Sequence, residues 1–130
     1  MLVLDSGGLS ALAEQSGDAI ATLRMSRAAA ARVVVPSVVI AESLRGDAAD
    51  ARTNQILSGL VTVEIGEREA REAARLKRAS RMTGVQHTID ALVVAVASLA
   101  GGGAILTSDV EDIAALASAR PDLVVVPIRA

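Results

Sequence analysis

The sequence contains no cysteine and no aromatic residue, and each absence excludes a class of function. Without cysteine the chain has no disulfide framework and no thiolate chemistry. This composition fits a reducing cytosol, so we expect a cytoplasmic protein. Without phenylalanine, tyrosine or tryptophan, no side chain offers an aromatic platform for stacked bases. Any nucleic acid that the chain binds is therefore held through phosphate contacts, metal and shape.

The chain also lacks an excess of positive charge and a long apolar segment. Its net charge is −2, whereas a basic surface is the usual footprint of a nucleic-acid binder. The most apolar segment, Ala91–Ala100, is well short of the roughly 20 residues that span a bilayer. It predicts a buried helix and no membrane association. The N-terminal "MLVLDSGG" has neither the basic flank nor the apolar run of a signal peptide.

Short apolar runs alternate with helical patterns along the 130 residues, which suits one domain, 1–130, of α/β class. The apolar runs are continuous rather than alternating, as in parallel strands that are buried on both faces. Ligands of such sheets bind beyond the carboxyl ends of the strands, where the strand order reverses. We expect strands at 2–4, 33–35, 60–65, 104–106 and 123–128, and helices at 6–15, 18–31, 37–44, 47–60, 67–82, 89–100 and 108–119.

Two of the expected strands run into a carboxylate. In "MLVLDSGG" the strand ends at Asp5, and in "AILTSDVEDI" Asp109 follows the apolar run, with Asp112 three residues later. If the early strands lie to one side of the first strand and the late strands to the other, Asp5 and Asp109 are neighbours at the switch point.

Two further acids interrupt apolar helices. Glu42 is the only charge between Val38 and Leu44, and Asp90 opens the all-apolar "DALVVAVASLA". A charge on apolar surface is costly unless it is paired or bound to a metal. Helices that bring Glu42 and Asp90 to the switch point would close a common acidic pocket.

Each acid also has a structural interpretation. Asp5 can cap the following helix, and acids at 109–112 favour the positive end of a helix dipole. Other candidate pairings are a Ser108–Glu111 capping box, a Thr88 cap beside Asp90, and a Glu42–Arg45 ion pair. These structural interpretations explain the acids less well if all four lie close together. Two carboxylates about 4 Å apart repel by roughly 4 kcal/mol at an effective dielectric near 20. Such a cluster takes up protons or binds a cation.

The chemistry of the donors indicates which cation. All-oxygen ligands without histidine or cysteine suit Mg²⁺ or Mn²⁺ rather than zinc. A divalent ion of this kind orients phosphate, neutralises developing charge and lowers the pKa of bound water. The acidic set therefore favours metal-dependent phosphodiester hydrolysis.

Four segments, in their order and spacing, resemble the acidic motifs of PIN-domain ribonucleases, and most closely those of VapC-type toxins of type II toxin–antitoxin pairs. The segments are "LVLDSGGLSAL", "VVIAESLRG", "TIDALVVAVA" and "AILTSDVEDI". The resemblance implies a three-layer α/β/α sandwich with a five-stranded parallel sheet. It also implies Mg²⁺- or Mn²⁺-dependent endoribonuclease activity, a homodimer, and a cognate antitoxin protein that blocks the site.

The same resemblance assigns the site residues. Asp5, Glu42, Asp90 and Asp109 match the acidic quartet as catalytic residues and metal ligands, and Asp112 matches a position that carries an additional acid in many members. Ser6 and Thr107 match supporting hydroxyl positions beside the first and last acids. The chain departs from the pattern at Gly7 and Gly8, where polar or bulkier residues are usual, and this predicts a looser loop.

An arginine stripe and the lone histidine leave two interpretations open. Arg68, Arg71, Arg75 and Arg78 lie three or four residues apart and so share a helix face. They form either a phosphate track for RNA or, as we favour slightly, a solvated face interleaved with glutamates. For His87 we expect a capping or surface role.

Two other classes of function compete with the ribonuclease. A receiver-type phosphoacceptor domain has similar length and strand order, with acids above the first strand. It needs a lysine after the last strand, however, and the only lysine is Lys77. An α/β binding module without activity is the third possibility.

Overall fold

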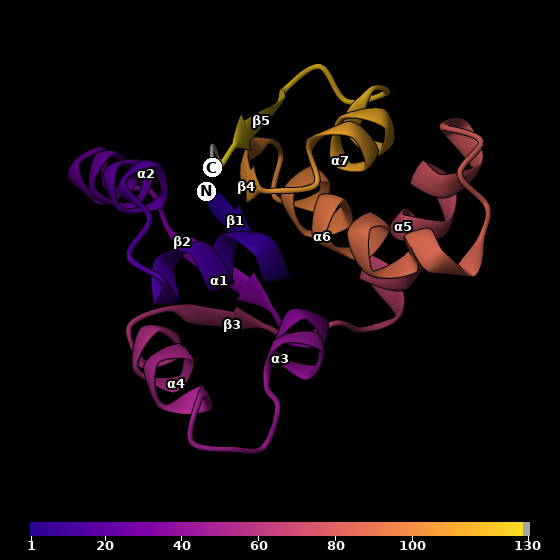
Figure 1. Cartoon of the computed structure of the whole chain (residues 1–130). Coiled ribbons are helices and arrows are strands. Elements are labelled where there is room, and N and C mark those ends of the chain that lie inside the picture. The colour runs from indigo at the N-terminus through magenta and orange to yellow at the C-terminus, as the bar shows by residue number, and fades with distance from the viewer. Residues whose placement is uncertain (129–130) are drawn as a thin grey trace.

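The computed structural model describes residues 1–128, which form a five-stranded sheet between two layers of helices (Figure 1). The strand order is β3-β2-β1-β4-β5, and every neighbouring pair is parallel. This confirms the predicted three-layer α/β/α sandwich. The strands are β1 (Leu2–Leu4), β2 (Val33–Pro36), β3 (Val61–Val63), β4 (Gly103–Thr107) and β5 (Leu123–Pro127).

The strand order reverses at β1, which lies between β2 and β4. In a receiver-type sheet the first and third strands are neighbours, whereas here β3 is at the edge. The similarity of strand order to the receiver fold expected from the sequence is therefore wrong, and the receiver alternative loses its structural basis.

Each predicted helix is present, although most are shorter than predicted. They are α1 (Ser6–Ala13), α2 (Gly17–Ala28), α3 (Ser37–Ser43), α4 (Asp50–Ser58), α5 (Glu67–Ala79), α6 (Thr88–Leu99) and α7 (Val110–Ala117), and a 3₁₀ turn, η1 (Val85–His87), precedes α6. Three helices stop early because Gln15, Ala30 and Arg81 adopt positive φ. In each case the next N–H bonds back to a carbonyl in the last helical turn, which closes the helix.

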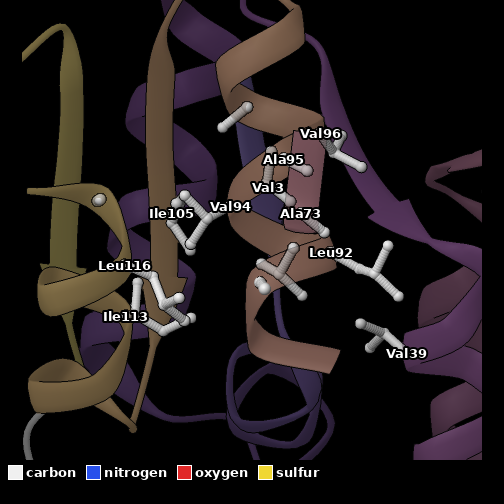
Figure 2. Close-up of a cluster of buried hydrophobic side chains, with 14 of the residues drawn as sticks. Val3, Val39, Ala73, Leu92, Val94, Ala95, Val96, Ile105, Ile113 and Leu116 are labelled. Carbon is white, nitrogen blue, oxygen red and sulfur yellow. The ribbon is translucent and has the colours of Figure 1, made fainter. Parts of the chain in front are cut away.

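The two faces of the sheet bury separate cores because side chains alternate along a strand. Leu2 and Leu4 face α1 and α2, whereas Val3 faces α6. Figure 2 shows Val3 and Ile105 against Val94 of α6, with further contacts from α5 and α7. Within residues 1–128 no helix combines the length and apolarity needed to cross a membrane.

A buried carboxylate joins three segments on the α5–α7 side of the molecule. Glu72 of α5 is 2% exposed and accepts hydrogen bonds from Ser98 Oγ (2.6 Å), Arg120 Nη2 (2.7 Å) and Arg75 Nε (3.1 Å). Burial alone would raise the pKa of Glu72, but these donors outweigh it and hold the pKa below its usual value. The ionised side chain therefore links α5 to α6 and to the segment that follows α7.

We expect Glu72→Gln to lower the free energy of unfolding by about 1–3 kcal/mol, because the amide keeps the shape but loses charge-assisted bonds to Ser98 and two arginines. Urea denaturation measures the change. Glu67→Gln on the same helix is the matched control, since the Glu67–Arg71 pair is exposed at 78% and 69%, and should change stability by less than about 0.5 kcal/mol. Equal effects of the two substitutions would contradict a stabilising role for the buried network.

Candidate metal centre

The carboxyl ends of β1 and β4 lie side by side, and Asp5 is held between them. Its Oδ1 accepts a hydrogen bond from the Gly8 N–H (2.7 Å), and its Oδ2 accepts one from Thr107 Oγ1. The Thr107 hydroxyl oxygen in turn accepts a hydrogen bond from the Asp109 N–H (2.8 Å). Asp5 is only 4% exposed, so both its carboxylate oxygens have fixed positions. The N-cap role considered for Asp5 and its place in the acidic site are therefore compatible.

Three other carboxylates converge beside Asp5. Asp90 lies in the first turn of α6, Asp109 is the N-cap residue of α7, and Asp112 lies in the first turn of α7. One oxygen from each lies within 4.8 Å of the others. The family resemblance gave Asp112 only as an additional acid outside the quartet, but the structure places it in this tight group.

The electrostatics of Asp90 and Asp5 reflect this crowding. Burial, a hydrogen bond with the Asp109 carboxyl, and the charges of Asp109, Asp5 and Asp112 raise the pKa of Asp90 from 3.8 to about 7. Burial also raises the pKa of Asp5, and the Asp109 and Glu42 charges add to the effect against the bonds from Thr107 and Gly8. The group thus carries more negative charge than its surroundings balance, which is the condition that a bound cation relieves.

Glu42 stands apart from the tight group. It is exposed near the end of α3, and its negative charge contributes to the raised pKa of Asp5. Within the described residues Glu42 forms no ion pair with Arg45. The expected single cluster of four acids is therefore arranged as three converging aspartates, a buried Asp5 beside them and Glu42 on the solvent side.

Gly7 and Gly8 tighten the site rather than loosen it, which corrects the prediction from sequence. A Cβ built on Gly8 would lie 2.5 Å from the Leu106 backbone oxygen, and one on Gly7 would lie 2.1 Å from Ser108 Oγ. Both distances are far below van der Waals contact. The first turn of α1 therefore packs directly on the end of β4, and this contact brings the Gly8 N–H to Asp5.

Two predicted caps do not form in the part of the chain that the structure describes. Helix α7 begins at Val110, so Ser108 precedes the N-cap and makes no capping box with Glu111. Thr88 is the first residue of α6, and its hydroxyl accepts a hydrogen bond from Lys77 Nζ (2.9 Å). Asp90 and Asp109 thus lie near helix N-termini without these serine and threonine caps.

His87 occupies the N-cap position of α6, but its side chain makes no capping hydrogen bond among residues 1–128. Its Nδ1 lies 3.8 Å from Asp112 Oδ2, beyond hydrogen-bond length. Of the two roles expected for His87, side-chain capping is not formed, and its partly exposed side chain lies beside the acidic group, which agrees with a surface position.

The arginine stripe of α5 is exposed, and half of it is paired. Arg71 Nε lies 2.7 Å from Glu67 Oε2, and Arg75 Nε lies 3.1 Å from Glu72 Oε1. Arg68 and Arg78 are exposed on the same helix. This pairing is what the solvated-face interpretation expects.

The acidic group suits a hard divalent cation. Its donors are carboxylate oxygens, and three of them are close enough to share one ion. Burial, followed by the neighbouring carboxylates, raises the pKa of Asp90. The Gly8 N–H donor agrees with the N-cap role expected for Asp5, because an N-cap side chain accepts a hydrogen bond from the second or third helical N–H. The inclusion of Asp112 in the tight group could have been found from its spacing, since Asp109 and Asp112 are three residues apart at a helix start.

Comparisons with known proteins agree with this geometry. The family model described as "PIN domain" matches residues 2–118. Among solved structures, the chain is similar to one in the crystal structure of VapBC2 from Rickettsia felis bound to a DNA fragment from their promoter. That match has a TM-score of 0.72 and 14% identity, and it covers 95% of this chain and 96% of the other. No curated protein matches the chain.

Proposed function

Because this chain belongs to the PIN domain family, we propose that it is a Mg²⁺- or Mn²⁺-dependent endoribonuclease that acts as the toxin of a toxin–antitoxin pair. The observation that carries the proposal is the convergence of Asp90, Asp109 and Asp112 within 4.8 Å, with the pKa of Asp90 raised to about 7. Carboxylates held this close repel one another, and a bound cation or proton removes that repulsion. The buried Asp5 beside the group strengthens the same argument.

Each residue has a role in this proposal. Asp90, Asp109 and Asp112 hold the ion, with Asp5 and Glu42 completing the acidic surroundings on the buried and exposed sides. Gly8 and Thr107 keep the Asp5 carboxylate in place, and Thr107 also holds the backbone of Asp109. When bound, a divalent ion supplies Lewis-acid activation of phosphate and water. Water adds to the phosphorus and the ribose 3′-oxygen leaves, which gives 5′-phosphate and 3′-hydroxyl ends.

Supporting hydroxyls surround the acids. Ser6 is the first residue of α1, directly after Asp5, and Ser108 lies between Thr107 and Asp109. We assign Ser6 to the positioning of substrate or water rather than to metal binding, because hydroxyls are weaker ligands than the carboxylates nearby.

The proposed partner is an antitoxin protein, and the proposed assembly is a homodimer in the cytoplasm. The support for the antitoxin is the fold match to a chain of the VapBC2 complex, which extends over nearly the full length of both chains. An antitoxin that covers the acidic group would inhibit the enzyme without altering its fold.

Adding Mn²⁺ to the metal-free protein tests the proposal. At about 100 times the dissociation constant, Mn²⁺ should stabilise the fold by roughly 2.7 kcal/mol and switch on cleavage of RNA, and EDTA should reverse both effects. Asp112→Asn should weaken the stabilisation by Mn²⁺, whereas Asp122→Asn, an acid at an exposed position near β5, should not. If the wild-type protein shows no saturable stabilisation and cuts no RNA, it is an inactive binding module instead.

A further inference from the structure

A cavity of about 520 Å³, lined by residues of α1, α3 and α4, lies beside the acidic group. Figure 1 shows these three helices near one another. Ser6 and Ser108 line it, and these residues directly adjoin Asp5 and Asp109 in the chain. Arg45 and Arg52 line the same cavity from the α3–α4 connection and from α4. The same cavity therefore lies next to the acidic group and is lined by two arginine side chains that have no role in the proposed hydrolysis.

Both arginines extend from anchored segments. The carboxylate of Asp50 accepts hydrogen bonds from the N–H groups of Arg45 (2.9 Å) and Gly46 (2.7 Å), which fixes the turn that carries Arg45. Arg52 Nη1 donates to the Ala13 backbone oxygen (3.2 Å) at the end of α1. A guanidinium has five N–H donors, so Arg52 keeps donors for a ligand.

The acids in the cavity wall are partly engaged by the protein itself. Both oxygens of Asp50 accept bonds from the turn, and these bonds lower its pKa, with the Arg45 N–H as the main cause. Glu14 accepts a hydrogen bond from Ser10 Oγ (3.3 Å). The third acid of the wall, Glu42, is exposed and forms no ion pair with Arg45 among the described residues. The other polar groups of the lining are hydroxyls, among them Ser10 and Thr53. A wall that combines two guanidinium groups with hydroxyls and a carboxylate suits a ligand that presents both an anion and hydrogen-bond donors.

We propose that this cavity binds a nucleotide next to the scissile phosphate of single-stranded RNA, with Arg45 and Arg52 contacting its phosphate or base. The inference rests on the proposed ribonuclease function. The volume is typical of a site for one small ligand of roughly 300–1,000 Å³, which fits a splayed-out nucleotide and not a duplex. Because the chain has no aromatic side chain, guanidinium planes and hydroxyls are the groups left to hold a base.

The test measures RNA binding separately from cleavage. A fluorescent single-stranded RNA of randomised sequence is titrated with Asp90→Asn protein, which binds without cutting, and with the same protein carrying Arg45→Ala and Arg52→Ala. We expect affinity to fall by about 10- to 100-fold. The slope of log K against log salt should also fall by about 0.7 for each phosphate that an arginine no longer neutralises.

Arg68→Ala with Arg71→Ala in the same background is the matched control, since it removes the same charge from the exposed face of α5. This pair should change affinity by less than about threefold, the scale of weak surface electrostatics. A duplex of matched composition should bind more weakly than the single strand. Thermal melting of each variant checks that the loss of the Arg52–Ala13 bond leaves the fold intact.

Three results would overturn the inference. They are a larger loss from the α5 pair than from the cavity pair, equal binding of duplex and single strand, and unchanged affinity after removal of the Arg45 and Arg52 side chains. The last result would indicate that the cavity takes a polypeptide segment of the partner. Cleavage by wild-type protein in Mn²⁺ separates the two levels: if it persists, only the cavity assignment fails, and if it is absent together with Mn²⁺ binding, the ribonuclease proposal fails as well.

Discussion

Replacing Asp90 with asparagine is expected to abolish RNA cleavage while raising the free energy of unfolding of the metal-free protein by about 2–4 kcal/mol. The gain follows from the raised pKa of Asp90, about 7 against 3.8, because the fold disfavours the ionised carboxylate at neutral pH. An amide of the same shape carries no charge and can donate to Asp109. Urea denaturation in EDTA at about pH 8 measures the stability, and release of labelled RNA fragments measures the activity.

The pH dependence of this gain has a defined sign. The folded-state pKa of Asp90 lies above the unfolded value, so the destabilisation by Asp90 is complete above about pH 7 and decreases as the pH falls toward about 4. Below the unfolded value the side chain is neutral in both states, and the advantage of Asp90→Asn should vanish. Asp122→Asn, at an exposed position, is the control for removing one carboxylate elsewhere on the surface. A variant that is less stable than wild type at about pH 8, or a gain that does not change with pH, would refute the crowding argument.

Changing Gly8 to alanine is expected to lower the free energy of unfolding by about 2–4 kcal/mol. Helix propensity alone predicts the opposite, since alanine stabilises a helix by about 1 kcal/mol relative to glycine. The contact decides the sign, because a Cβ would lie 2.5 Å from the Leu106 backbone oxygen, which has little room to move in a buried parallel strand. Chemical denaturation of the purified variant gives the value.

Gly17→Ala is the control for the Gly8 substitution. Gly17 opens α2, and a Cβ built there has no atom within 4 Å. This change should be neutral or stabilising by up to about 1 kcal/mol. If the two variants have the same stability, the close packing of α1 on β4 is not what requires glycine. Loss of cleavage by Gly8→Ala at a temperature where it stays folded would show that the close packing of α1 on β4 positions Asp5, because alanine keeps the backbone N–H that donates to it.

Several features of the site follow from the sequence because they depend on strand periodicity and topology alone. Continuous apolar runs predict buried parallel strands, and parallel strands place their carboxyl ends at one edge. The adjacency of the segments that carry Asp5 and Asp109 therefore needed only the strand order, which has β1 beside β4. The roles of these residues remain predictions.

Helix ends were harder to predict, for a physical reason. Glycine is the usual signal for the left-handed residue after a helix, yet Gln15, Ala30 and Arg81 take that conformation here. Their backbones are held by hydrogen bonds to the last helical turn rather than by an intrinsic preference. The side-chain pattern continues past each of these residues, so it cannot show where the helix ends.

The one-dimensional pattern thus specifies which faces are apolar, where strands stop and which acids follow them, because each depends on neighbours a few residues away. Tertiary packing determined which acids from different segments meet: Asp90 joins the Asp109–Asp112 pair, whereas Glu42 stays on the solvent side. It also placed Gly8 in close contact with the backbone of Leu106. In the same way it brought Glu72 to Ser98 and Arg120, which lie 26 and 48 residues away in the sequence. These outcomes depend on distances of a few ångströms between segments far apart in the chain, and no local pattern encodes such distances.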